Sequence, residues 1–346
     1  MGINNIINLL GGLGLFLFGM KYMSDGLNQV AGSKMKSLLE KLTRNRFKGF
    51  LLGVLVTAVI QSSSATTVML MGFLNAGIMD LFQATGVIIG ANIGTTITAV
   101  LIAIDVSVIA PFCIFVGAAV ALFSKKQSQK YIGQIILGFG ILFFGLKYMS
   151  GDSAMGVLKS SEAFQHFITT ANNPILGLLI GIAICSVLQS SSAAIGVLQV
   201  LALQGVMPMN FAIYLIIGIN VGSATPLFLS AIGAKTNAKR AAVIYFIFDF
   251  VGMLIFTPVA MFTPFAKWIT TLSDNGSVQV AAAHIIFKVV TAVFLLPFVK
   301  IVVKLSEKII KSHEHETEFR FVYIDRKLNG NTISTALQLG REVERM

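Results

Sequence analysis

Gln61-Ser62-Ser63-Ser64-Ala65 is repeated in this chain as Gln189-Ser190-Ser191-Ser192-Ala193, 128 residues later. Each copy lies in an apolar segment long enough to enter a bilayer, residues 48–78 and 174–206. Consecutive polar side chains at membrane depth cost several kcal/mol unless a partner or ligand satisfies them. Two such runs at matched positions are typical of a membrane transporter with a two-fold internal repeat.

Two further blocks follow the same repeat. Gly11–Ser24 (GGLGLFLFGMKYMS) and Leu137–Ser150 (LGFGILFFGLKYMS) are identical at eight of fourteen positions. Gly90–Thr95 (GANIGT) returns as Gly218–Ser223 (GINVGS), again 128 residues on. Glycines that pack helices explain the first block but not the polar ones. We therefore interpret residues 5–123 and 131–262 as two repeats.

The composition is that of a membrane protein. Hydrophobic residues make up 55% of the chain and charged residues only 12%, whereas about 25% charged residues are usual in soluble domains. The repeat and composition predict an all-α polytopic protein with about seven transmembrane helices of roughly 20 residues each. These spans are expected at 3–23, 84–104, 106–123, 131–149, 210–233, 241–262 and 278–303. Segments 48–78 and 174–206 are too long for one span and too short for two, so we predict re-entrant helical hairpins there.

The positive charges indicate the orientation. The net charge is +11, and most basic residues lie in loops 24–48, 124–130 and 234–240 and at the start of the tail. The positive-inside rule makes these regions cytoplasmic and the N-terminus external. Lys147 is a mild exception that can snorkel from an outer helix end. An odd number of crossings separates the repeats, so we predict that the second is inverted and that the hairpin tips meet near the midplane.

The remaining features carry weaker signals. Residues 1–306 form the expected transport domain, including a retained first helix, and residues 307–346 form a cytoplasmic tail. Cys113 and Cys185 lack metal-ligand spacing and are expected to be small buried side chains. His313 and His315 are expected in a solvated linker. No basic patch interleaved with aromatic residues appears, so no nucleic-acid partner is expected.

The polar runs suit ion binding rather than catalysis. A helix start at a serine run offers free amides and a partial positive charge to an anion. Hydroxyls, carbonyls and amide oxygens suit a hard cation such as sodium. Asn92 and Asn220 predict a second pair of helix breaks. No Arg or Lys is near either motif in sequence, so an anion would be held by neutral donors and a co-bound cation. The serines have no paired base, so an enzyme is not expected.

These motifs resemble the sodium/phosphate cotransporter family, which includes type II sodium-dependent phosphate transporters and bacterial relatives. The resemblance covers about residues 5–300, and Phe319–Met346 resembles the first helix of a PhoU-like domain. It implies symport of inorganic phosphate with sodium as the coupling ion, across the inner membrane of a bacterium and without another cofactor. By match, the implied site residues are Gln61, Ser62, Ser63, Ser64, Thr66, Gln189, Ser190, Ser191 and Ser192, with Asn92, Thr95, Thr96, Asn220 and Ser223 beside them.

The chain departs from the family pattern at three positions. Ala224 lacks the hydroxyl usual there, and Thr225 is the candidate replacement. Asp249 and Lys288 stand where Asn is common, at similar depth in two consecutive spans. Each charge costs roughly 2.5–3.5 kcal/mol near a helix centre. We therefore predict a buried ion pair between them; the alternative is two charges that face separate water-filled crevices.

Other functions stay open at this point. The substrate could be sulfate, arsenate or a dicarboxylate instead of phosphate. The chain could also be a phosphate sensor or scaffold that signals through its tail, or a passive channel. The sequence also leaves a homodimer open.

The predicted topology can be tested with single cysteines. Cysteines placed at Ser128 and Asn237 are expected to react with impermeant thiol reagents only from the cytoplasm, because both lie in basic loops. A cysteine at Ser161 is expected to react only from outside. Labelling of positions 128 and 161 from the same face would refute the inverted repeat.

Overall fold

The structure is a computed structural model that describes residues 3–42, 46–104, 106–151, 154, 161, 162, 164, 166 and 173–311. The chain divides into two units, Met1–Ile310 and Lys311–Met346, and the fold below is that of the first. The predictions for His313, His315 and the helix Phe319–Met346 lie outside the described residues.

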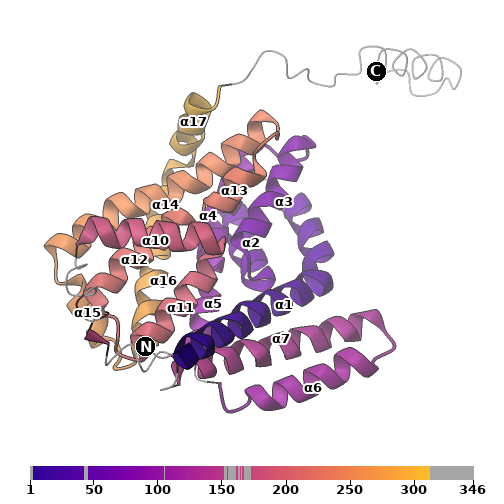
Figure 1. The fold of residues 1–346 in the computed structure, drawn as a ribbon. Helices are drawn as coiled ribbons and strands as arrows, with labels where there is room; N and C mark the ends of the chain where they lie inside the picture. The colour runs from indigo at the N-terminus through magenta and orange to yellow at the C-terminus, as the bar shows by residue number, and fades with distance from the viewer. Residues whose placement is uncertain are drawn as a thin grey trace, which may run out of the picture. The chain divides into compact units, whose positions relative to one another are not determined.

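The described residues are helical and contain no strand. In chain order the first helices are α1 (Ile3–Leu42), α2 (Arg46–Ile60), α3 (Ser63–Asn75), α4 (Leu81–Gly94), α5 (Thr96–Ala103), α6 (Ala110–Phe123) and α7 (Gln127–Ser150) (Figure 1). They are followed by α10 (Pro174–Leu188), α11 (Ser191–Leu203), α12 (Met209–Gly222), α13 (Thr225–Ser230), α14 (Thr236–Phe262), α15 (Phe265–Thr271), α16 (Gly276–Leu295), the 3-10 turn η2 (Leu296–Phe298) and α17 (Val299–Ile309).

Six helical stretches among the described residues are long and apolar enough to span a membrane. They are Ile3–Leu39, Leu81–Ala103, Gln127–Ser150, Met209–Ser230, Thr236–Phe262 and Gly276–Ile309. The expected seventh span, 106–123, is the 14-residue helix α6, which is shorter than the roughly 20 residues of a full crossing. The chain is thus an all-α, multi-pass membrane protein.

One expectation about the first loop is wrong. Residues 24–42, expected in a loop, continue α1 as a single helix to Leu42. This stretch contains no proline, and the strong helix formers of residues 34–42 outweigh Gly26 and Gly32.

Both polar runs break a helix in the same way. Gln61 (φ 61°) and Gln189 (φ 52°) are in the left-handed region, and no other described non-glycine residue has a positive φ. The serine that follows each Gln then caps the next helix: Ser62 Oγ accepts from Ala65 N at 3.1 Å, and Ser190 Oγ accepts from Ala193 N at 3.2 Å. A left-handed residue other than glycine costs about 1–2 kcal/mol, so the repeated break indicates a functional constraint. Re-entry of these helix pairs into the membrane stays a prediction.

Glycines bring equivalent helices together in the two halves. α2 packs on α4, and α10 packs on α12. A Cβ added at Gly53 or Gly90 would lie 2.1 or 1.9 Å from a carbonyl oxygen of the facing helix. Gly181 and Gly218, which are 128 residues further along, show the same close approach, at 2.4 and 2.2 Å. Both repeats therefore build the same pair of closely packed helices.

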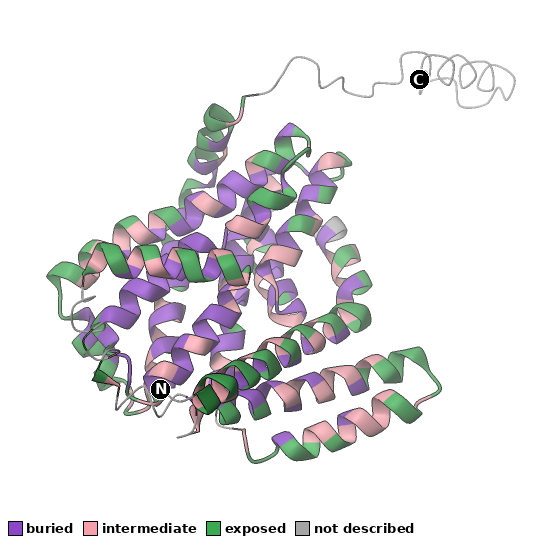
Figure 2. Cartoon of the chain, in the orientation of Figure 1, coloured by how far each residue is buried: buried purple, intermediate pink, exposed green. Residues whose placement is uncertain are grey.

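A third glycine contact joins the repeats. α1 and α7 run antiparallel, with Gly12 beside Gly145 and Gly19 beside Gly138. Figure 2 shows mostly exposed and half-buried residues along α1 and α6, mostly buried residues along α12, and a mixture of the three classes along α14 and α16. Exposed apolar side chains of α6, such as Phe112, Phe115 and Phe123, are those of a lipid-facing helix.

Adding a methyl group to this contact is expected to destabilise the protein. In Gly19→Ala the new Cβ would lie 2.3 Å from Leu142 N, and such overpacking typically costs about 1–3 kcal/mol. Gly14→Ala is the matched control, because nothing lies within 4 Å of a Cβ there. Thermal unfolding in detergent should show a lower midpoint for Gly19→Ala only. Equal midpoints would contradict the packing described.

Candidate functional site

The two polar runs line one cavity of about 390 Å³. Residues 60–65 enter it from the α2–α3 break, and residues 188–192 enter it from the α10–α11 break. α1 forms another wall, with Lys21, Ser24, Asp25 and Asn28. A segment of each repeat therefore contributes to a single polar space.

Nine residues expected at the site line this cavity. They are Gln61, Ser62, Ser63, Ser64, Thr95, Gln189, Ser190, Ser191 and Ser192. The two glutamines differ in their surroundings. Gln61 is buried, with its amide on Ala58 O and its Oε1 accepting from Thr98 at 2.8 Å, whereas Gln189 is exposed.

The cavity offers an anion two helix starts and one lysine, whose charge is offset by Asp25 of the same wall. α3 and α11 both begin at its wall, and the first amides of a helix have no partner within that helix. Together with the helix dipole these amides favour an anion. The expectation that no basic side chain approaches the motifs is wrong. Lys21, some 40 residues away in sequence, lines the same cavity because α1 crosses both helix breaks.

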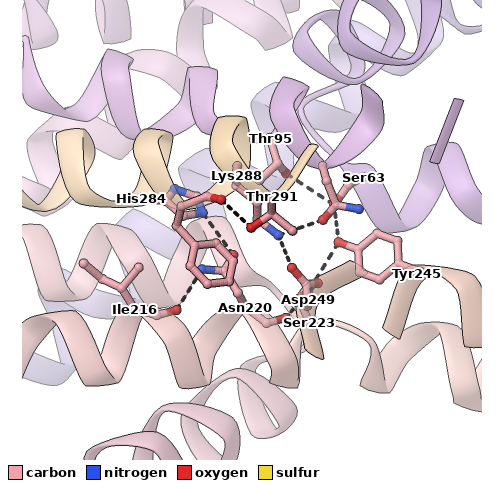
Figure 3. Close-up of polar contacts among 12 residues, drawn as sticks. Ser63, Thr95, Ile216, Asn220, Ser223, Tyr245, Asp249, His284, Lys288 and Thr291 are labelled. Atoms are coloured by element: carbon pink, nitrogen blue, oxygen red, sulfur yellow. Dashed lines mark hydrogen bonds and ion pairs between the residues drawn. The ribbon is translucent and has the colours of Figure 1, made fainter. Parts of the chain in front are cut away.

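A chain of hydroxyl groups leads from the cavity wall into the protein. Ser63 Oγ accepts from Thr95 Oγ1 at 3.3 Å and lies 2.9 Å from the Tyr245 hydroxyl. Tyr245 OH in turn accepts from Ser223 Oγ at 3.3 Å. The Tyr245 phenol, on α14, thus joins a motif of the first repeat to the helix break of the second (Figure 3).

Behind this chain lies a fully buried ion pair. Lys288 Nζ lies 2.6 Å from Asp249 Oδ1, and both side chains have an exposed fraction of 0%. Lys288 also donates to Asn92 Oδ1 at 2.7 Å, and Ser223 donates to Asp249 Oδ2 at 3.1 Å. The structure therefore brings together the two charges that the sequence indicated as partners. They do not face separate crevices.

The repeated asparagines hold equivalent positions. Asn92 and Asn220 each donate to the carbonyl four residues earlier, at 3.1 and 2.8 Å. Each then uses its Oδ1 to contact α16, which lies after both repeats. Asn92 contacts Lys288, and Asn220 contacts His284 Nε2 at 3.2 Å. His284 and Lys288 are one helical turn apart, so one face of α16 contacts both repeats (Figure 3).

The second pair of helix breaks is also present. α4 ends at Gly94 and α5 begins at Thr96, while α12 ends at Gly222 and α13 begins at Thr225. The intervening residues Thr95, Ser223 and Ala224 keep right-handed helical angles. These breaks interrupt the helices without reversing them.

Besides Asn92, Asn220 and Ser223, three more of the expected site residues do not line the cavity and form local hydrogen bonds instead. Thr66 accepts from Thr57 at 3.0 Å, and Thr96 donates to Ile93 O at 2.8 Å. Thr225 lies 2.9 Å from Ser186 Oγ. Its role as a replacement for the hydroxyl absent at Ala224 stays a prediction.

Sequence reasoning missed Lys21, Asp25, Tyr245 and His284. Lys21 had a signal, because it belongs to the repeated block that ends in Lys-Tyr-Met-Ser. Tyr245 and His284 begin the two stretches, Tyr245–Asp249 and His284–Lys288, in which Asp249 and Lys288 drew attention, but their own partners are 182 and 64 residues away and were not indicated.

The helices and the shared cavity define a multi-pass membrane protein with a polar cavity lined by both serine runs. The family model described as Na+/Pi-cotransporter matches residues 15–151 and 156–275. The chain belongs to this family, which is one of transporters and not of enzymes.

Several curated proteins are similar to the chain. "Uncharacterized protein YqeW" of Bacillus subtilis is 28% identical over 298 residues, 85% of this chain and 95% of the relative. "Putative inorganic phosphate export protein YjbB" of Escherichia coli K12 is 26% identical over 349 residues, 99% of this chain but 64% of the relative. Human "Sodium-dependent phosphate transport protein 2B" is 30% identical over 196 residues, 52% of this chain and 27% of the relative. No solved structure matches the chain.

The ion pair gives a double-mutant test. Asp249→Asn or Lys288→Met alone leaves a buried charge without its partner, which typically costs about 3–5 kcal/mol. The double change Asp249→Asn with Lys288→Asn removes both charges and should recover most of that loss. Thermal unfolding of the purified variants measures this difference. A double variant as unstable as the sum of two single losses would contradict the pairing.

Proposed function

We propose that this protein is a secondary active transporter that couples the movement of inorganic phosphate to that of sodium. The observation that carries the proposal is the single cavity lined by both serine runs, in a chain that belongs to the Na+/Pi-cotransporter family. Names of relatives that mention phosphate, and in one group sodium, support the choice of ions.

The anion would bind at the helix starts. A phosphate ion needs many hydrogen-bond donors, and the serine hydroxyls and first amides of α3 and α11 supply them from two directions. Lys21 adds a full positive charge on the side of α1. Hydrogen bonds to charged groups contribute about 1.5–3 kcal/mol each, so a few such contacts suffice to hold the anion.

Sodium would bind among the oxygen atoms of the same cavity. Asp25 supplies a carboxylate, and Gln189, Asn28 and the serines supply neutral oxygens, which are the ligands that hard cations prefer. A cation bound near the phosphate also reduces the repulsion between the anion and Asp25. This mutual dependence is a physical basis for coupling.

We further propose a bacterial inner-membrane location with the N-terminus outside and the C-terminus in the cytoplasm, and inverted repeats with re-entrant hairpins. Residues 1–306 would form the transport domain and 307–346 a tail. A sodium gradient directed into the cell would then drive uptake. Export is the second candidate direction, because the YjbB relatives are named as putative phosphate exporters.

Flux measurements in proteoliposomes test the function. With sodium outside and none inside, labelled phosphate should accumulate above its external concentration, and collapse of the sodium gradient should release it. Sulfate, arsenate and a dicarboxylate serve as competitors. Equilibration without accumulation would indicate a channel, and no flux at all would contradict transport. In vesicles with a single protein orientation, a sodium gradient imposed first inward and then outward distinguishes uptake from export.

Loss of single hydroxyls tests the site. Ser63→Ala and Ser191→Ala are each expected to raise the half-saturating phosphate or sodium concentration about ten-fold, since each removes a hydrogen bond to a charged ligand. Ser230→Ala is the control, because Ser230 is exposed on α13 and donates only to Pro226 O. Unchanged kinetics in both cavity variants would refute the assignment.

A further inference from the structure

A second cavity, of about 140 Å³, lies against α7. Its α7 wall consists of Phe143, Leu146, Lys147 and Ser150. The opposite wall comes from the end of α5, the C-terminal half of α11 and the start of α16. Gln199 of α11 is fully buried in this wall, with its amide nitrogen held by Ala99 O and Ser277.

The α7 wall is the repeat counterpart of the α1 wall of the site. Aligned blocks Gly11–Ser24 and Leu137–Ser150 differ by 126 in residue number. Four α1 residues of this block line the first cavity. When 126 is added to their residue numbers, the result is the set of α7 residues that line the second cavity. The pairs are Leu17 with Phe143, Met20 with Leu146, Lys21 with Lys147, and Ser24 with Ser150. All four members of each set line their own cavity, so the correspondence involves a whole helix face.

The two lysines lie toward opposite ends of one helix pair. α1 and α7 run antiparallel and meet at Gly12, Gly19, Gly138 and Gly145. Lys21 comes after this contact along α1, and Lys147 comes after it along α7. α11 extends from one cavity to the other, because Ser191 and Ser192 line the first and Gln199 lines the second. These residues are about 12 Å apart along the helix at 1.5 Å per residue.

We propose that Lys147 is the second substrate-positioning lysine of this carrier. It would contact the anion when the second cavity is open, as Lys21 would in the cavity that contains the two serine runs. The inference rests on the proposed phosphate transport. In carriers with inverted repeats, the two access states arise when the repeats exchange roles around a fixed site. The exchange would bring the α7 face to the helix breaks and remove the α1 face.

The charges also favour an anion in the second cavity. Lys147 is the charged residue among the described residues that line it, and no carboxylate accompanies it there. In the first cavity the same helix face also presents Asp25, whose counterpart by the 126-residue shift is Gly151. The α7 face therefore offers phosphate a positive charge and a hydroxyl but offers sodium no carboxylate.

Transport kinetics measured with phosphate on one face of the membrane at a time test this proposal. In oriented proteoliposomes, Lys147→Gln is expected to raise the half-saturating phosphate concentration at least about ten-fold for phosphate on the face where α7 ends, because a charged contact is lost. The half-saturating sodium concentration should stay within about two-fold. Lys21→Gln should act on phosphate presented at the opposite face. Lys147→Arg retains the charge and should restore most of the affinity.

Lys267→Gln is the matched control, since Lys267 is an exposed lysine of α15, on the same face as Lys147 in the proposed topology. If Lys147 only marks the membrane boundary, Lys147→Gln and Lys267→Gln should behave alike, and the proposal fails.

A binding readout separates a local effect from misfolding. Ser150→Cys, with Lys147 intact, should be labelled by an impermeant thiol reagent, and phosphate should protect it in a saturable manner. Protection should disappear when Lys147→Gln is added, while Ser24→Cys stays protected in the same background. If the wild-type protein transports phosphate normally but phosphate does not protect Ser150→Cys from labelling, this inference is overturned and the proposed function stands. Absence of wild-type phosphate flux would overturn the proposed function and the inference with it.

Discussion

The structure depends on the burial of two opposite charges. Asp249 and Lys288 have no solvent exposure, and charges in such surroundings must be paired and fully hydrogen-bonded. Lys288 therefore needs Asn92 as well as Asp249, and Asp249 needs Ser223. These requirements hold α4, α14, α16 and the α12–α13 break at fixed separations, since a shift of any one by more than about 1 Å would leave a charge without a partner. Close packing adds to this constraint, since a Cβ at Gly252 of α14 would lie 2.5 Å from the Phe287 ring of α16.

The ion pair also explains why the two halves are not independent. The repeats supply the same asparagine, and α16, which belongs to neither, supplies a different partner to each: Lys288 to Asn92 and His284 to Asn220. The internal symmetry of the sequence is therefore broken at the centre of the molecule. The two equivalent serines of the cavity differ in the same way. The Ser63 hydroxyl bonds to Tyr245, whereas the equivalent Ser191 faces the cavity from the other half. Two motifs with identical sequence are thus held differently.

Sequence reasoning located the motifs better than it located their neighbours. The helix breaks at Gln61 and Gln189 followed from local rules, because a polar run between apolar segments and a serine cap are short-range signals. The Asp249–Lys288 pair followed from an energetic rule, since unpaired charges are costly in an apolar span. The approach of Lys21 to the serines did not follow, because the crossing of α1 over both breaks depends on its glycine contact with α7. The helical continuation of α1 to Leu42 was missed because charge was interpreted as a loop signal, although lysine and glutamate favour helices.

The buried pair has a consequence for how the protein is made. Asp249 and Lys288 are 39 residues apart in the chain, and α14 precedes α16, so α14 reaches the insertion machinery before α16 does. Until then the aspartate has no counter-charge, and placing it in lipid costs roughly 2.5–3.5 kcal/mol. The 27 residues of α14 are otherwise strongly apolar, which is enough to admit the helix alone. α16 carries its lysine into a bilayer in which the matching carboxylate is already present. The last long helix among the described residues therefore joins the bundle where the Asp249 carboxylate offers its lysine a counter-charge.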